Sequence, residues 1–251
     1  LFAGNPAAVC PLPDWLPDPT LQAIAAENNL SETAFVVDEG DALRIRWFTP
    51  TTEVRLCGHA TLAAAWVWRH HCADGPVPNP LPFASASGPL TVTAEADGRL
   101  TLDFPVEPFE PVAAPPELTE ALGLPIREVA AGQDWLVRLA DEAAVRSADP
   151  DRDRLRRLAR RGVIVTAEGE EADFVSRFFA PGCGIDEDPV TGSAHCMLAP
   201  FWAERLERDS LEARQLSARG GELSCTLQGD RVRISGRVIP YLEGTIRLDG
   251  A

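Results

Sequence analysis

Three ionisable side chains in this 251-residue chain could carry proton-transfer chemistry: Glu32, His59 and Asp188. Glu32 stands at the mouth of a β-rich run, and desolvation there would raise its pKa, so that it could exchange protons near neutral pH. His59 follows a glycine and precedes an apolar helix, where its imidazole could donate to a substrate carboxylate or hold the acid's proton. Asp188 could pair with a substrate amino group. Together they indicate acid–base catalysis on a small polar ligand.

Each of these residues also has a purely structural interpretation. Glu32 could be an exposed carboxylate at a strand end, and His59 could be a loop histidine bonded within the protein. Asp188 could order its loop by capping the helix that follows it. We interpret His195, one turn inside that helix, as a packing residue. The residue pattern alone leaves these alternatives open.

The segment from Arg177 to Trp202 contains a second chemical feature, the start of a helix at Thr191, Gly192 and Ser193. The first N–H groups of a helix have no intrahelical partner and lie at the positive end of its dipole, so they favour a bound carboxylate or phosphate. Asp188 beside them would repel a phosphate. The site therefore favours a small amino or hydroxy acid.

The chain contains a similar series of motifs twice. Arg46–Pro50 (RWFTP) and Arg177–Pro181 (RFFAP) lie 131 positions apart, as do the helix-opening pairs Asp18-Pro19 and Asp149-Pro150. Such self-similarity predicts two related units. Prolines between residues 105 and 116 mark a linker, so we expect domains at 1–110 and 117–239, and a terminal strand at 240–251 that could return to the first unit.

The counterpart of the second helix start is Leu56–Thr61, which leads into residues 60–68. This run is apolar around its whole circumference, which predicts a helix buried on all sides by surrounding strands. In the second unit we expect an acidic loop at residues 186–188, a helix from about Ser193, and a kink or end at Pro200. Two helix N-termini related by pseudo-twofold symmetry would face each other across an interdomain cleft, where ligand sites tend to form.

Composition removes several classes of function. The formal net charge of −15 argues against nucleic acid or an anionic membrane as partner, and no apolar run is long enough to cross a bilayer. All 23 basic residues are arginine, which excludes a lysine Schiff base and the lysine of a phosphate-binding loop. Six cysteines without CxxC pairs are typical of reduced thiols in the cytoplasm. His70, His71 and Cys72 lack ligand spacing, so we expect no metal site.

A rival chemistry is that of cofactor-independent amino-acid racemases, in which two thiols face each other across a twofold cleft. Cys57 lies beside Gly58, but the matching helix start of the second unit contains no cysteine, and Cys183 lies on the far side of the acidic loop. We therefore expect no thiol pair and interpret both cysteines as structural.

Motifs along nearly the whole chain resemble the PhzF-like family, relatives of a phenazine-biosynthesis isomerase that share the diaminopimelate epimerase fold. The matching segments are GNPAAV (4–9), NLSETAF (29–35), FTP (48–50), LCGHATL (56–62), GI (184–185), EDPVTGSAH (187–195) and QLSARGG (215–221). Members of that family usually carry one more strand before the Gly-Asn-Pro turn, so we expect residues upstream of Leu1.

The resemblance implies an α/β (α+β) fold of two pseudo-symmetric domains, each a β-barrel-like sheet around a central helix. It also implies that Glu32 is the catalytic acid–base, without metal or cofactor, and that His59 and Asp188 position substrate and acid. Gly58, Thr191, Gly192 and Ser193 would then bind substrate, and relatives make a homodimer the expected assembly.

The sequence therefore predicts a cytoplasmic, cofactor-free isomerase that moves a proton on a small carboxylate-bearing metabolite. An amino-acid epimerase or racemase is the alternative enzyme. A metabolite-binding protein without turnover is the alternative from another class.

Overall fold

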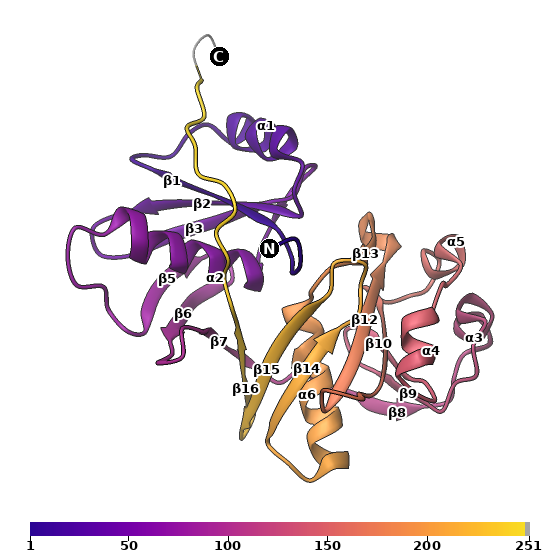
Figure 1. Cartoon of the computed structure of the whole chain (residues 1–251). Coiled ribbons are helices and arrows are strands. Elements are labelled where there is room, and N and C mark those ends of the chain that lie inside the picture. The colour runs from indigo at the N-terminus through magenta and orange to yellow at the C-terminus, as the bar shows by residue number, and fades with distance from the viewer. Residues whose placement is uncertain (249–251) are drawn as a thin grey trace.

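The computed structural model describes residues 1–248 as a mixed α/β protein with one large sheet and six α-helices (Figure 1). The strands of the N-terminal half are β1 (Ala7–Leu12), β2 (Glu32–Asp38), β3 (Leu43–Phe48), β4 (Glu53–Val54), β5 (Leu81–Ser85), β6 (Gly88–Ala94) and β7 (Leu100–Pro105). The remaining strands are β8 (Glu110–Val112), β9 (Glu128–Ala131), β10 (Trp135–Arg138), β11 (Val163–Glu168), β12 (Phe174–Ala180), β13 (Ile185–Asp188), β14 (Ser210–Gln215), β15 (Gly221–Gln228) and β16 (Arg231–Gly236). The helices are α1 (Asp18–Asn28), α2 (Gly58–Val67), α3 (Pro116–Leu122), α4 (Glu142–Ser147), α5 (Arg152–Leu155) and α6 (Gly192–Leu206), with a π-turn at Trp68–Cys72 and a 3₁₀-turn at Pro181–Cys183.

A single hydrogen-bonded path joins the two halves of the sheet. Its order is β1-β2-β3-β5-β6-β7-β16-β15-β14-β12-β11-β10-β9-β8, with β4 on β3 and β13 on β12. The halves meet where β7 pairs antiparallel with β16, Leu102 lying opposite Ile234. The last strand among residues 1–248 thus pairs with the last strand of the first half.

Helix α2 lies inside the curl of the N-terminal strands. It contacts β1 and β2 at one end of that half-sheet and β6 and β7 at the other (Figure 1). Its buried positions are mostly small, including Ala60, Ala64 and Ala65, which lets strands approach on several sides. The apolar run therefore forms a helix inside the first half, but the expectation that it is buried on all sides was wrong: Leu62, Trp66 and Val67 are only half-buried.

Helix α6 is the counterpart of α2 and contacts β14, β15 and β16. We expected Pro200 to kink or end this helix; it does not end it, because the helix continues to Leu206. Proline cannot donate to the carbonyl four residues earlier, which is that of Cys196. The N–H of Glu107 donates to this carbonyl instead, at 3.1 Å, and thereby satisfies the acceptor that Pro200 leaves free.

Two further expectations for the second half need correction. Residues 185–188 form strand β13 rather than a loop, because they pair with β12, Phe178 lying opposite Asp188. We expected the helix that follows Asp149-Pro150 to reach Gly162, but it is only the short α5, which ends at Leu155 and is capped by the side chain of Asp151.

The predicted terminal strand at 240–251 is not found in its described part, residues 240–248; residues 249–251 lie outside the described residues. Pro240 removes a ladder donor, and β16 already has β15 and β7 on its two edges. The segment nevertheless passes the first half, where Tyr241 packs edge-to-face on Phe2 and Glu243 lies 3.7 Å from His71.

Within residues 1–248, no helix is long and apolar enough to span a membrane.

Candidate functional site

Glu32 and His59 come together from a strand start and a helix start. Glu32 is the first residue of β2, and His59 is the second residue of α2. The His59 Nε2 atom lies 3.1 Å from Glu32 Oε2, and the side chains keep only 20% and 13% of their surface exposed. The distance permits a charged contact, but the present angle is not that of an aligned hydrogen bond. Catalytic hydrogen bonds often align only when substrate binds.

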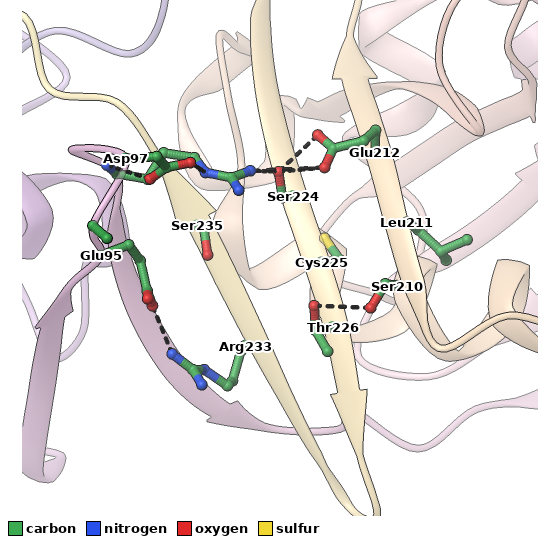
Figure 2. A pocket seen from close by; sticks show the side chains of 12 residues that line it. Glu95, Asp97, Ser210, Leu211, Glu212, Ser224, Cys225, Thr226, Arg233 and Ser235 are labelled. Carbon is green, nitrogen blue, oxygen red and sulfur yellow. Dashed lines mark hydrogen bonds and ion pairs between the residues drawn. The ribbon is translucent and has the colours of Figure 1, made fainter.

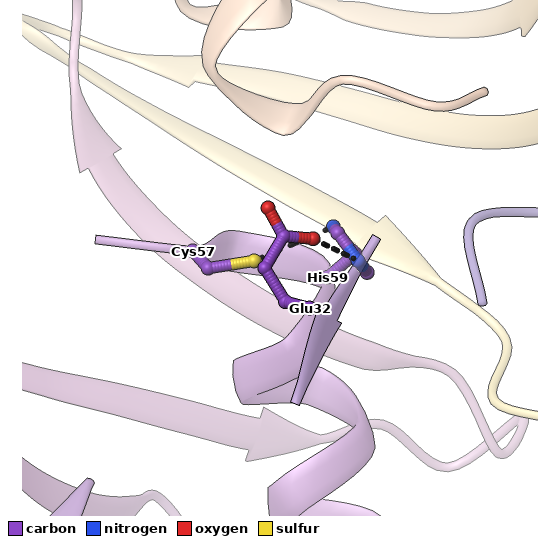
Figure 3. Close-up of side chains that lie close together, drawn as sticks. All are labelled: Glu32, Cys57 and His59. Atoms are coloured by element: carbon purple, nitrogen blue, oxygen red, sulfur yellow. Dashed lines mark hydrogen bonds and ion pairs between the residues drawn. The ribbon is translucent and has the colours of Figure 1, made fainter. Parts of the chain in front are cut away.

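The other ring nitrogen of His59 faces a thiol. Cys57 Sγ lies 3.5 Å from His59 Nδ1, and Figure 3 shows Glu32, Cys57 and His59 pointing toward one another. Burial alone would lower the pKa of His59, but the adjacent Cys57 and the Glu32 carboxylate raise it well above its usual range. Donor atoms of the three residues lie within 4.8 Å of one another, a spacing that a metal ion could also bridge. The direct contacts through the ring already account for this cluster.

Asp188 ends strand β13 and is held by hydrogen bonds from both halves of the chain. Its carboxylate accepts from Asn5 Nδ2 at 2.9 Å and from Thr191 Oγ1 at 2.5 Å. Burial raises the pKa of Asp188, opposed by the Thr191 hydrogen bond. The charges of His59 and Glu32 also act on this pKa, in opposite directions. Asp188 therefore belongs to the same electrostatic site as Glu32 and His59.

Thr191 and Gln215 support Asp188 from behind. The Thr191 N–H donates to Gln215 Oε1 at 2.8 Å, and Gln215 Nε2 donates to the Asp188 carbonyl at 2.8 Å. The Thr191 hydroxyl is already bonded to Asp188. The N–H and the hydroxyl of Thr191, which we predicted to bind substrate, are thus both used to hold Gln215 and Asp188 in place. Gln215 was not among the predicted site residues, although it opens the QLSARGG motif.

Asn5 is a second residue that sequence reasoning missed. Its amide donates to Asp188 and to the Val190 carbonyl at 3.0 Å, and its own Oδ1 is buried without a partner. The adjacent Gly4 N–H donates to the Gly220 carbonyl at 2.7 Å. The Gly-Asn-Pro turn therefore ties the first half to the second at the site. The motif was visible in the sequence, but its partner lies 183 positions away.

The glycines and Ser193 line the two helix starts. A Cβ at Gly192 would enter open space, and Ser193 is exposed. A Cβ at Gly58 would reach Phe104 at an ordinary contact distance of 3.5 Å. Gly192 and Ser193 thus keep the start of α6 accessible.

Other ionisable neighbours are engaged elsewhere. Glu187 forms a two-point ion pair with Arg177, at 2.7 and 2.8 Å, and Glu53 pairs with Arg46. Cys183 is exposed, and its sulfur faces the carbonyl of Arg161. His195 is fully buried, donates Nδ1–H to the Thr191 carbonyl at 2.8 Å, and has its pKa lowered by burial to about 4. It is a neutral packing residue.

A groove of about 470 Å³ lies elsewhere, between the β6–β7 turn and strands β14–β16 (Figure 2). Its charged side chains already have partners: Arg233 pairs with Glu95 at 2.6 Å, and Ser224 donates to Glu212. None of the predicted site residues lines it. We therefore base the candidate active site on the chemistry around Glu32 and not on this groove.

Comparison with known proteins identifies the family. A family model described as phenazine biosynthesis-like protein, PhzC-PhzF, matches residues 1–244. The chain belongs to this family. A Pseudomonas aeruginosa protein named as an uncharacterized isomerase is 57% identical over 98% of this chain and 94% of its own length. The crystal structure of a PhzF-family protein from Enterococcus faecalis superposes with a TM-score of 0.91 at 48% identity, covering 94% of this chain and 90% of that one.

The fold also extends to racemases. A probable proline racemase from Agrobacterium radiobacter matches with a TM-score of 0.62 at 13% identity, over 92% of this PhzC-PhzF chain and 82% of that chain. This likeness concerns the fold alone. The predicted family and fold class are therefore confirmed, and relatives of the chain are named isomerases.

Proposed function

We propose that this protein is a cofactor-independent isomerase that moves a proton on a small carboxylate-bearing metabolite, an amino or hydroxy acid that can be cyclic. The observation that carries the proposal is the contact of Glu32 with His59, in a buried site that Asp188 shares. Relatives named isomerases support the reaction class.

In the proposed reaction, the Glu32 carboxylate removes a proton from one carbon of the substrate and returns it to another. His59 orients the carboxylate through its Nε2 side. The exposed start of α6, at Gly192 and Ser193, would bind the substrate carboxylate through N–H groups and the helix dipole. Asp188, held by Asn5 and Thr191, would face a substrate amino or hydroxyl group.

The test is proton NMR in deuterated water with a panel of small unsaturated amino and hydroxy acids. We expect wild type to introduce deuterium at a carbon of at least one compound. Glu32→Gln should lower that rate by about 10²–10⁴, the usual contribution of a general acid–base. Glu27→Gln, an exposed glutamate on α1, is the matched control and should retain the wild-type rate.

The alternatives predict other outcomes. A thiol-based epimerase or racemase would keep exchange in Glu32→Gln and lose it in Cys57→Ser. A binding protein would raise its melting temperature with a ligand and leave that ligand chemically unchanged.

We also propose that the protein is cytoplasmic and forms a homodimer. The first proposal is supported by six cysteines that are all unpaired, and the second by the family resemblance.

A further inference from the structure

The two ring nitrogens of His59 have different neighbours. Nε2 faces Glu32 Oε2 at 3.1 Å, and Nδ1 faces Cys57 Sγ at 3.5 Å. A neutral imidazole carries its proton on only one nitrogen, and the partner of one nitrogen decides what the other can do. If the proton sat on Nδ1, the Nε2 lone pair would face the Glu32 carboxylate and repel it. The neighbour of Nδ1 therefore controls the contact that the proposed base depends on.

The Cys57 sulfur can fill this role in both charge states of the ring. Cys57 is 6% exposed, and burial raises the pKa of its thiol, so that it stays protonated at neutral pH. Its S–H can then donate to Nδ1 of the neutral ring, which leaves the proton on Nε2. When the ring is protonated, the same sulfur can accept from Nδ1–H. In both states Nε2–H points to Glu32.

The backbone holds Cys57 in place for this contact. Cys57 is the extended N-cap residue of α2, with φ −144° and ψ 111°. Its carbonyl accepts from the N–H and the hydroxyl of Thr61, at 3.2 and 2.5 Å. Since Cys57 and His59 stand on either side of the first helical residue, the start of α2 fixes their relative position.

We propose that Cys57 is a positioning residue for His59: its sulfur holds the ring with Nε2–H toward Glu32 and so orients the carboxylate. This inference rests on the proposed function of Glu32 and revises our interpretation of Cys57 as merely structural. The thiol exchanges no proton with substrate in this role. The titratable groups around the ring are Glu32 on β2, Cys57 before α2, and Asp188 on β13.

The direct test needs no substrate. Protein labelled with ¹⁵N-histidine is titrated, and long-range ¹H–¹⁵N correlations report the tautomer and pKa of His59; His59→Asn assigns its signals among the four histidines. We compare wild type with Cys57→Ala, Cys57→Val and Cys57→Ser. Val fills the space that Ala would leave empty and cannot hydrogen-bond, so it keeps the test available if the Ala cavity prevents folding. The control is Cys196→Ala, a thiol of similar burial at 7% exposure.

We expect a single Nε2–H tautomer for neutral His59 in wild type, Cys57→Ser and Cys196→Ala. Cys57→Ala and Cys57→Val should show mixed tautomers and a lower His59 pKa, because the protonated ring loses its acceptor. An unchanged tautomer and titration in Cys57→Ala and Cys57→Val would overturn the proposal.

A kinetic arm uses the panel compound that exchanges deuterium fastest with wild type. Cys57→Val should lower kcat about 10-fold, the value of one hydrogen bond, with KM little changed. Cys57→Ser should restore at least half of the wild-type rate. If Cys57→Ser lowers kcat as much as Cys57→Val does, Cys57 acts as a thiol base, and the proposal that it positions His59 is wrong. If wild type exchanges nothing, the proposed function fails, while the tautomer measurement still decides the role of Cys57.

Discussion

Asn5 shows how one amide can connect the two halves of this chain. Its Nδ2 donates to both the Asp188 carboxylate and the Val190 carbonyl, and both acceptor residues are half-buried. Buried acceptors that lose a donor cost more than the bond itself contributed. We therefore expect Asn5 to affect both the stability of the fold and the charge state of Asp188.

Asn5→Ala should lower the free energy of unfolding by about 1–3 kcal/mol. It should also raise the pKa of Asp188 further, because the anionic form loses a donor. Urea unfolding measures the first effect, with Asn28→Ala as control, since Asn28 bonds Thr33 within one half at 3.1 Å. If Asn5→Ala lowers the free energy of unfolding no more than Asn28→Ala does, the contact between the two halves through Asn5 has no special role in stability.

His195 should make the protein sensitive to acid. Its pKa is about 4 in the folded state and 6.5 as the reference value, so the unfolded state binds more protons between these values. Stability should therefore be complete above about pH 6.5 and fall as pH decreases, by about 3 kcal/mol near pH 4.

The replacement His195→Asn preserves a donor to the Thr191 carbonyl and removes the titration. Urea unfolding at about pH 7 and about pH 4.5 should show a smaller acid loss than in wild type. His70→Asn is the matched control, because His70 makes the same contact to the carbonyl four residues earlier but is exposed. Equal acid loss in His195→Asn and wild type would show that other groups dominate.

At the scale of elements, α6 depends on a contact from outside the helix. Pro200 leaves the Cys196 carbonyl without a helical donor, and the Glu107 N–H between β7 and β8 replaces it. The proline thus creates an attachment point for the connection between the two halves.

Pro200→Ala should supply the missing helical N–H and compete with Glu107 for that carbonyl. We expect faster amide hydrogen exchange at Glu107 and new protection at residue 200, measured by NMR. Ala203→Ser, a change on the same helix that leaves its backbone donors intact, should not alter Glu107. Unchanged protection of Glu107 in Pro200→Ala would mean that other contacts hold the connection.

At the scale of the whole molecule, most exposed large apolar side chains lie in two segments, residues 1–2 and 239–248, which touch where Tyr241 packs on Phe2. Among the described residues, seven of the nine exposed large apolar side chains belong to these segments: Leu1, Phe2, Ile239, Tyr241, Leu242, Ile246 and Leu248. Exposed apolar groups that cluster along a short segment are typical of interaction surfaces. This surface is where the proposed homodimer would bury them.

Replacing Tyr241 and Leu242 by serine should therefore weaken self-association. Light scattering after size exclusion should give a dimer mass for wild type and a shift toward single-chain mass for the double variant. Leu56→Ser, which removes an exposed leucine elsewhere, should stay dimeric. A monomeric wild type would refute the homodimer, and a dimeric double variant would place its interface on another face.

The sequence by itself determined the family, an apolar helix at residues 60–68, a second helix from about Ser193, and Glu32, His59 and Asp188 as candidate residues. These rest on local patterns, since hydrophobic periodicity and residues around a turn act over a few positions. Only the tertiary structure decided the partners: Asn5 with Asp188, Glu107 with Cys196, and β7 with β16. It also formed β13 from a predicted loop and left residues 240–248 out of the sheet. Such pairings depend on which edges and unpaired groups remain when the chain closes on itself, and no local pattern records that.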